Sequence, residues 1–341
     1  MTGSAQSRSA WRSRAARLGE RLRPADFHPE VAAWLARSRR GPWGVAFSGG
    51  ADSLALLLTL WAHWPERRDR LVALHFNHRL RGRESDADER FCRRVCAALG
   101  LRCRVGRWAG RHRGASEAAA RAARHGFLAR AMRAAGVRTL WLAHQQDDIA
   151  ESLLMRLARG SGTAGLAAPR PVQAMADGRT FLRPLLPVKK ATLVAALRGA
   201  GLRWREDRSN AGMDHFRNRL RHRVLPGWIR ASGRDALAGA ALARERLDED
   251  DRALEAWVDT LRPLDRRRRT LDLAVLGGRP RAVVRRALHR WLLSLAPPPD
   301  LSRQGFETLL TLVERGRPSR FSLGHRWFAV IRRGRLTQQR T

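Results

Sequence analysis

Apolar positions in the first two thirds of the chain gather in short runs of strand length. WGVAFS (residues 43–48), LVALHF (71–76), LRCRV (101–105) and TLWLAH (139–144) each suit a strand of a buried parallel sheet. A longer stretch with helical spacing follows each of these runs. The alternation predicts the doubly wound α/β class, in which helices cover both faces of a parallel sheet.

The expected helices begin where a strand run gives way to helical spacing. Two glycines, Gly49 and Gly50, lead from the first strand into an apolar helix. In SDADERFCRRVCAALG, Ser85 is expected to be the N-cap, because acidic residues follow it and suit the positive end of a helix. An Ala-rich helix is predicted from about Ser116 to Ala135, and a further one begins at about Asp147.

The remaining chain has a different texture. Residues 164–180 carry Pro169 and Pro171 and are expected to form a loop. From about Ser232 long helical patterns dominate, and residues 321–336 are typical of two strands about a turn. We therefore divide the chain into a basic N-terminal segment (1–40), an α/β domain (41–232) and a smaller, mainly helical domain with a C-terminal hairpin (233–341).

The charge balance indicates a polyanionic partner. Lys and Arg number 67 against 31 Asp and Glu, so the formal net charge is +36, and Lys189 and Lys190 are the only lysines. Long-range attraction and counterion release both grow with the number of phosphates neutralised, so nucleic acid or anionic lipid is favoured. No run of 18 apolar residues occurs, so we expect no spanning helix and no membrane partner.

The cysteines and the first residues bear on location. Cys92, Cys96 and Cys103 are odd in number and contain no CxxC pair, which argues against a disulfide framework and a structural zinc site. We therefore expect a reducing, cytoplasmic location. Residues 1–24 have the composition of a mitochondrial transit peptide, but we favour a frayed basic tail, because Arg is frequent throughout the chain.

A glycine-containing turn between the first strand and its helix is the strongest local motif. Two glycines allow close backbone approach to a ligand, and the N–H groups at the helix start form a cradle for pyrophosphate. It is no Walker A loop, because GxxxxGK[ST] is absent and no lysine is nearby in the sequence. Asp52 would repel phosphate without a cation, so Mg²⁺ is implied. The motif consists of Ser48, Gly49, Gly50, Ala51, Asp52 and Ser53.

This motif resembles the signature of the PP-loop ATP pyrophosphatases. With the segments at residues 75–92, 143–162 and 204–226, the chain resembles the tRNA(Ile)-lysidine synthase family from about residue 45 to 226. The resemblance implies that ATP adenylates C2–O of the wobble cytidine in the CAU anticodon of tRNA(Ile). Free L-lysine then displaces AMP to give lysidine, with ATP cleaved to AMP and PPi. It also assigns ATP binding to residues 41–232 and tRNA binding to 233–341.

Acidic residues follow the strand TLWLAH, where sheets of this kind bind ligands. Asp148 and Glu151 share a helix face at i and i+3. With Asp147 they suit the task of holding and deprotonating an amine, although carboxylates at a helix start also complement the helix dipole. The resemblance implies that Asp148 belongs to the metal and ATP site with Asp52, that Glu151 binds lysine, and that His144 lies in the ATP site.

Two groups of basic residues complete the expected site. The resemblance places Arg121 and Arg124, at i and i+3 of a helix, beside the phosphates, where guanidinium groups stabilise developing charge; a solvated helix face is the alternative. Arg217, Asn218 and Arg221 present donors for tRNA phosphate or the cytidine edge. The expected catalytic residues are Asp52, Arg121, Arg124, Asp148 and Glu151.

Two other functions stay open at this point. A PP-loop tRNA thiolase would also adenylate a base oxygen but needs cysteines to deliver sulfur, and the three cysteines here fall in one helix and the following strand. A nonenzymatic RNA-binding protein could also use the +36 field. Arg285 and Arg286 in the helical half are expected to contact RNA phosphates. A homodimer is possible.

Overall fold

The computed structural model describes residues 2–37, 41–109, 116–206, 212–213, 215–265, 267–296 and 298–340, apart from the side chains of 2–7 and 117. Two compact units divide the chain, Met1–Glu245 and Arg246–Thr341. The division falls inside a helix, α11 (Ala236–Leu261), whereas the sequence pattern places the boundary near Gly233, where helical spacing restarts. A helix that continues across a domain boundary leaves no sequence signal at the division itself.

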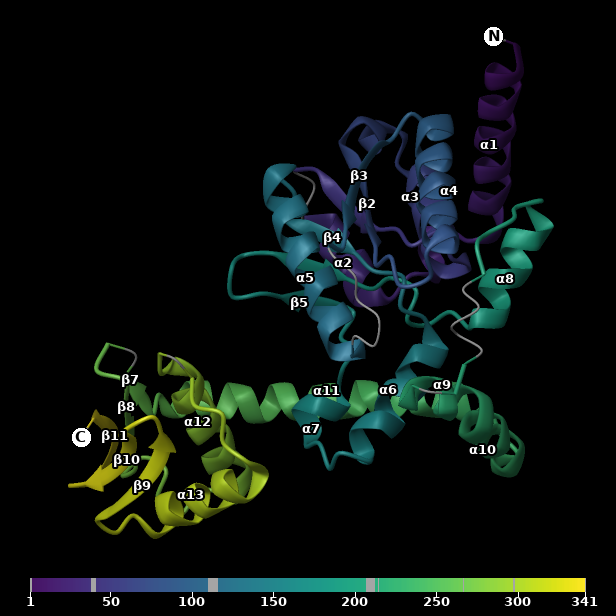
Figure 1. The fold of residues 1–341 in the computed structure, drawn as a ribbon. Coiled ribbons are helices and arrows are strands. Elements are labelled where there is room, and N and C mark those ends of the chain that lie inside the picture. The colour runs from purple at the N-terminus through teal and green to yellow at the C-terminus, as the bar shows by residue number, and fades with distance from the viewer. Residues whose placement is uncertain are drawn as a thin grey trace. The chain divides into compact units, whose positions relative to one another are not determined.

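A six-stranded sheet forms the centre of the first unit (Figure 1). Its strand order is β3-β2-β1-β4-β6-β5, and all neighbours pair in parallel except the antiparallel pair β5 and β6. This confirms the predicted doubly wound α/β class. The strands are β1 (Trp43–Ala46), β2 (Leu71–Asn77), β3 (Arg102–Arg107), β4 (Thr139–Trp141), β5 (Val172–Ala174) and β6 (Thr180–Leu182).

Helices cover both faces of this sheet. One apolar core joins the sheet to the first, third, fourth and eighth helices, and a separate core packs Leu128 and Met132 of α5 against Val72 and Leu140 of the strands. The helices of this unit are α1 (Thr2–Arg21), α2 (Pro29–Arg37), α3 (Ala51–His63), α4 (Arg83–Leu99), α5 (Glu117–Ala134), α6 (Gln146–Leu157), α7 (Thr163–Leu166), α8 (Lys190–Gly199), α9 (Phe216–Arg219) and α10 (Leu225–Ser232), with 3-10 turns at Pro24–Asp26 and Pro65–Arg70 and a π-helical turn at Leu220–Val224.

The N-terminal segment belongs to the core, so the expected frayed tail is wrong. Ala15 and Leu18 of α1 and Leu22, which follows this helix, are at most 2% exposed and lie in the same apolar core as α3. A Cβ at Gly19 would come within 2.9 Å of Ala62 Cβ, so the close contact between the two helices requires glycine there. Arginines are so frequent in this segment that its few buried apolar positions give no clear helical pattern in the sequence.

Two smaller expectations are also wrong. The N-cap of α4 is Gly82, and Ser85 lies inside the helix, where its Oγ accepts a hydrogen bond from the Arg81 N–H. Residues 164–180, expected to be a loop, contain α7 and the edge strand β5. The prolines do not interrupt a sheet here, because Pro169 and Pro171 precede β5 instead of lying within it.

The second unit packs two helices against an antiparallel sheet of order β7-β8-β11-β10-β9. The predicted hairpin is present, but it is part of five strands instead of two. Leu288, Trp291 and Leu310 of the helices are fully buried with Leu336 of the sheet. The elements are α12 (Arg281–Ser294), α13 (Arg303–Arg315), β7 (Leu264–Asp265), β8 (Thr270–Asp272), β9 (Ser319–Gly324), β10 (Trp327–Arg332) and β11 (Arg335–Arg340).

Ion pairs inside this unit occupy arginines that the sequence assigns to RNA. Arg286 is only 11% exposed and pairs with Asp251, and its Nε lies 3.3 Å from Glu255 Oε1. Arg285 pairs with Glu307 at 3.2 Å. Contact of Arg286 with RNA phosphate stays a prediction, and it would have to compete with these ion pairs.

Within the described residues, no helix combines the length and the apolarity that crossing a bilayer requires.

Truncating Leu18 to alanine should destabilise the first unit. Leu18 has no exposed surface, so Leu18→Ala is expected to lower the free energy of unfolding by about 2–5 kcal/mol, as for other buried leucines. Urea denaturation followed by circular dichroism measures this change. Ser13→Ala, on the exposed side of the same helix, should change it by less than about 0.5 kcal/mol. Equal effects of the two variants would show that α1 does not pack as described.

Candidate active site

The segment at residues 48–53, called the PP-loop after the motif that it resembles, joins the end of β1 to the start of α3. Gly49 has φ +89°, and a Cβ there would lie 3.1 Å from Cys92 Sγ, so both backbone conformation and space require glycine. The hydroxyls of Ser48 and Ser53 lie 2.9 Å apart, and Ser53 Oγ donates to Gly50 O at 3.1 Å. These serines therefore brace the loop so that the first N–H groups of α3 remain available to an anion.

A lysine from a distant part of the sequence contacts the PP-loop. Lys190 Nζ donates to Asp52 Oδ1 at 2.6 Å, although 138 positions separate them in the sequence. Burial raises the pKa of Asp52 above its usual value; the Lys190 charge opposes this increase and the Asp148 charge adds to it. Sequence analysis missed this residue. The signal available was that only two lysines remain in a chain whose other basic residues are all arginine.

Four residues predicted for different roles are joined in one ion-pair network. Arg217 Nη2 lies 2.5 Å from Asp148 Oδ1, and its Nε lies 2.5 Å from Glu151 Oε2. Arg221 Nε donates to Glu151 Oε1 at 2.6 Å. Glu151 is 1% exposed in its side chain, whereas the two arginines keep 29% and 35% exposure. The residues expected to bind lysine and those expected to bind tRNA thus form ion pairs with one another.

Asp148 also has a local structural role. Its Oδ2 accepts a hydrogen bond from the Gln145 N–H at 3.0 Å, and Gln145 Oε1 accepts one from the Asp147 N–H at 2.6 Å. Asp148 therefore caps the start of α6 and also takes part in the ion-pair network. The other carboxylate of this turn, Asp147, accepts from the Lys190 N–H at 3.0 Å and so fixes the start of α8 beside α6.

The other predicted residues lie around this network. Burial holds the pKa of His144 well below its usual value, and the charges of Arg183, Arg217, Arg124 and Arg121 add to this effect, so the imidazole is neutral. Arg121 and Arg124 are exposed on α5, on the face of the sheet opposite α3.

Asn218 belongs to a bracing contact. It is 7% exposed and its Nδ2 donates to Gly212 O at 2.9 Å. Its predicted contact with tRNA stays a prediction.

The carboxylates fit Mg²⁺ only together with a nucleotide. In the described part of the chain, no group of three or more His, Cys, Asp or Glu side chains could hold a metal ion. Asp148 lies near enough to Asp52 for its charge to raise the pKa of Asp52. Magnesium commonly takes one or two protein carboxylates and fills its octahedron with phosphate oxygens and water. These two aspartates are therefore a suitable pair, provided that Lys190 leaves Asp52.

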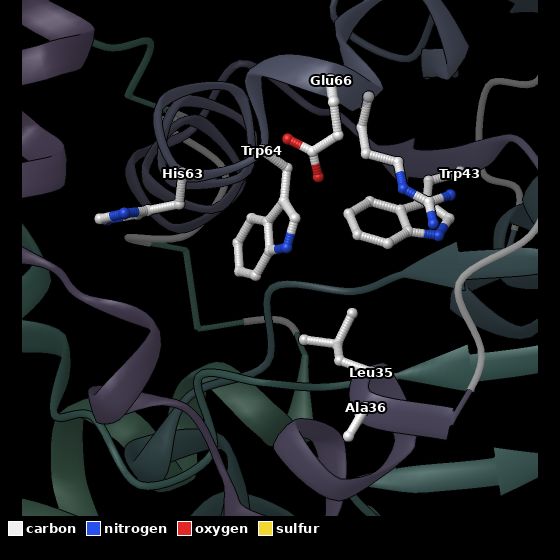
Figure 2. Close-up of a pocket in the computed structure, with 7 residues that line it drawn as sticks. Leu35, Ala36, Trp43, His63, Trp64 and Glu66 are labelled. Atoms are coloured by element: carbon white, nitrogen blue, oxygen red, sulfur yellow. The ribbon is translucent and has the colours of Figure 1, made fainter.

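Figure 2 shows one hollow of this unit. It measures about 360 Å³ and is lined by Leu35, Trp43, Trp64 and Glu66 among others. Trp43 is the first residue of β1, whereas the PP-loop follows the last one. The hollow is therefore at the opposite end of the strand from the predicted site.

The chain matches two known protein families. Residues 25–228 match the PP-loop domain, and residues 271–337 match the TilS substrate binding domain. Among curated proteins, it is 40% identical to the tRNA(Ile)-lysidine synthase of Rhodopseudomonas palustris over 68% of each chain. The chain belongs to the tRNA(Ile)-lysidine synthase family. The family resemblance expected from the motifs is thereby confirmed.

Other members of the tRNA(Ile)-lysidine synthase family are longer than the matched region. The Geobacter sulfurreducens synthase is 37% identical over 77% of this chain and 56% of its own length, and the Xanthomonas campestris synthase (strain 8004) is 37% identical over 85% and 66%. This chain therefore spans just over half to two thirds of these relatives.

A solved structure also shares the fold. The U34-tRNA thiolase NcsA from Methanococcus maripaludis, solved with its [4Fe-4S] cluster, superposes with a TM-score of 0.53 at 15% identity, over 71% of this chain and 80% of that one. At this identity the likeness supports the fold alone.

Removing the charge of Glu151 should destabilise the first unit. Glu151→Gln leaves Arg217 and Arg221 without their shared carboxylate, so we expect the free energy of unfolding to fall by about 3 kcal/mol, at the low end for buried ion pairs because both arginines still contact water. Urea titration provides the measurement. The matched change Glu20→Gln, at an exposed position of α1, should have an effect below about 0.5 kcal/mol. A Glu151→Gln protein as stable as this control would contradict the network.

Proposed function

We propose that the chain ligates free L-lysine to C2 of the wobble cytidine in the CAU anticodon of tRNA(Ile), with cleavage of ATP to AMP and PPi. Membership of the tRNA(Ile)-lysidine synthase family supports this function. The observation that carries the proposal is the juxtaposition of an anion cradle with amine-binding chemistry. Asp52 of the PP-loop lies close enough to Asp148 and Arg221 for their charges to shift its pKa. Both of these residues belong to the Glu151 network.

In the first step the cytidine O2 attacks the α-phosphorus of ATP and PPi departs. The N–H groups at the start of α3 would hold phosphate oxygens, and Lys190 supplies a compact ammonium with three donors to the same region. Mg²⁺, held by Asp52 and Asp148, would neutralise phosphate charge. Negative charge builds up on the departing PPi in this step. The nearby cations would stabilise that charge.

In the second step the lysine amine attacks C2 of the adenylated cytidine and AMP leaves. Free amines of this kind have a pKa of about 10.4, so at pH 7 the neutral nucleophile is disfavoured by about 4.6 kcal/mol. Asp148 and Glu151 are the carboxylates placed to bind the ammonium and to receive its proton. Because Arg217 and Arg221 occupy them here, lysine binding requires an exchange of cations at Glu151.

The thiolase alternative has less support. Cys92 and Cys96 are buried, and burial raises the pKa of Cys92, which keeps its thiol protonated and unreactive. NcsA resembles the chain at the level of fold only. The remaining cysteine, Cys103, is half-buried in β3, which β2 separates from β1 and the PP-loop, so sulfur transfer has less support than lysine ligation.

The decisive test is mass spectrometry of a CAU-anticodon tRNA(Ile) transcript after incubation with the protein, ATP, Mg²⁺ and lysine. The expected product carries the mass of lysine less water on the anticodon fragment. PPi release should require tRNA. Release without RNA, or a sulfur mass in place of lysine when a sulfur donor is present, would contradict the proposal.

The Asp52→Asn variant should separate chemistry from RNA binding. We expect formation of adenylated tRNA to fall at least about 100-fold, because metal-assisted charge stabilisation is worth several kcal/mol. The affinity for tRNA should stay within about twofold, since Asp52 makes no contribution to backbone contacts on RNA. Asp177→Asn, in the exposed β5–β6 turn, is the control and should leave both quantities unchanged. Normal PPi release by Asp52→Asn would remove Asp52 from the site.

A further inference from the structure

Arg183 is a buried cation whose neighbours within the described chain supply no compensating charge. It follows β6 directly, is 8% exposed, and donates from Nη1 to Arg170 O at 2.8 Å and from Nη2 to Gln173 Oε1 at 3.0 Å. Both acceptors are neutral. Its Nε is buried and has no hydrogen-bond partner in that part of the chain. A buried guanidinium with only neutral partners is costly, so its retention calls for an explanation.

Two more arginines surround this position. Arg156 of α6 donates from Nη1 to Ala168 O at 2.7 Å and to Gly165 O, so it too is held by neutral carbonyls. Burial, together with the charges of Arg156 and Arg121, lowers the pKa of Arg183 to about 10. We call Arg121, Arg156 and Arg183 the β6 arginine cluster. Its members repel one another and raise the local positive potential.

The contrast with the neighbouring network is informative. Arg217 and Arg221 reach into the same region, but each is matched by Asp148 or Glu151 at hydrogen-bond distance. In the β6 arginine cluster, by comparison, the charges that act on Arg156 and Arg183 within the described chain are all positive. Nearby His144 cannot compensate them, since a neutral imidazole carries no negative charge.

We propose that the β6 arginine cluster binds a phosphate oxyanion of the RNA backbone beside the nucleotide that reacts. This rests on the proposed function. Arginine forks recognise phosphate oxygens well, and a phosphodiester would supply the missing negative charge without the desolvation cost of a buried carboxylate. The neutral oxygens that hold Arg156 and Arg183 fix the two guanidinium groups in advance, so little side-chain entropy is lost when RNA binds.

The sheet order separates this phosphate from those of ATP. The PP-loop follows β1, Arg183 follows β6, and β4 lies between these two strands. Two strand spacings correspond to about 10 Å. Arg121 is on α5, which covers the face opposite α3 and its N-terminal cradle. A base that reaches the α-phosphorus at the PP-loop carries its own flanking phosphates, and these are the oxyanions that can reach the end of β6.

The test measures RNA binding by the full-length protein without ATP or lysine. The probe is a fluorescent CAU anticodon stem–loop RNA, titrated at several KCl concentrations. Arg183→Gln should weaken binding about tenfold and reduce the slope of log K against log salt by about 0.7, the value for one single-strand phosphate contact. The matched control is Arg179→Gln on the same hairpin, because Arg179 already pairs with Asp177. It should change the affinity by less than about twofold.

Two further arms fix the source of the phosphate and guard against misfolding. Binding of inorganic pyrophosphate, measured by calorimetry, should be the same for Arg183→Gln and the unchanged protein. Two RNAs carry a neutral methylphosphonate, one on the 5′ side and one on the 3′ side of the wobble nucleotide, and both should bind the unchanged protein more weakly. For one of these RNAs, Arg183→Gln should cause no additional loss of affinity. Arg121→Gln, at an exposed position that packs in no core, should reproduce the change in slope even if Arg183→Gln does not fold.

Three results would overturn the inference. A loss of pyrophosphate affinity with unchanged RNA binding would assign the cluster to the nucleotide. Unchanged slopes in both Arg183→Gln and Arg121→Gln would leave Arg183 as an anchor of the loop before β5. Either result leaves the proposed function standing if lysidine still forms. Failure of the unchanged protein to bind the stem–loop would overturn the proposed function together with this inference.

Discussion

The buried carboxylate of Glu151 is the constraint around which the site is organised. It has almost no contact with water, so it needs cations at hydrogen-bond distance, and Arg217 and Arg221 supply them. This pairing ties the chain around α9 to α6, and α6 in turn fixes α8 through Asp147 and Lys190. Lys190 then reaches Asp52 on the PP-loop. Ion pairs, together with this one hydrogen bond from the Lys190 backbone N–H, therefore connect four segments that are far apart in the sequence.

The local parts of this arrangement could be predicted from the sequence. Short apolar runs identify the central strands, and the glycines of the PP-loop identify the anion cradle, because both depend on residues adjacent in the chain. The contacts that close the site could not be predicted in this way. Lys190 meets Asp52, and Arg217 meets Glu151, only after the sheet has folded, and no periodicity encodes such pairs. The same holds for α1, whose buried Ala15 and Leu18 lie among arginines.

The network has a consequence for how the two substrates would meet. Under the proposed function, an incoming lysine ammonium would have to displace a guanidinium from Glu151, and the displaced arginine would become available to a phosphate. Exchange between two cations on one carboxylate changes no net charge, so its cost is smaller than that of exposing a bare buried carboxylate. Lysine binding and RNA binding would then favour each other, since each stabilises the arrangement that the other requires.

The net charge of +36 favours binding of a polyanion but does not indicate where on the protein the polyanion would bind. Many arginines are neutralised inside the protein: Arg286 pairs with Asp251, Arg290 with Glu255 and Asp259, and Arg217 with Asp148. Such arginines stabilise the fold and make little contribution to long-range attraction, because their fields are cancelled within a few ångströms. Under the proposed function, the cations that would direct RNA are the remaining ones, which include those held by neutral oxygens. On that criterion Arg183, although only 8% exposed, is a candidate, because both of its hydrogen-bond acceptors are neutral.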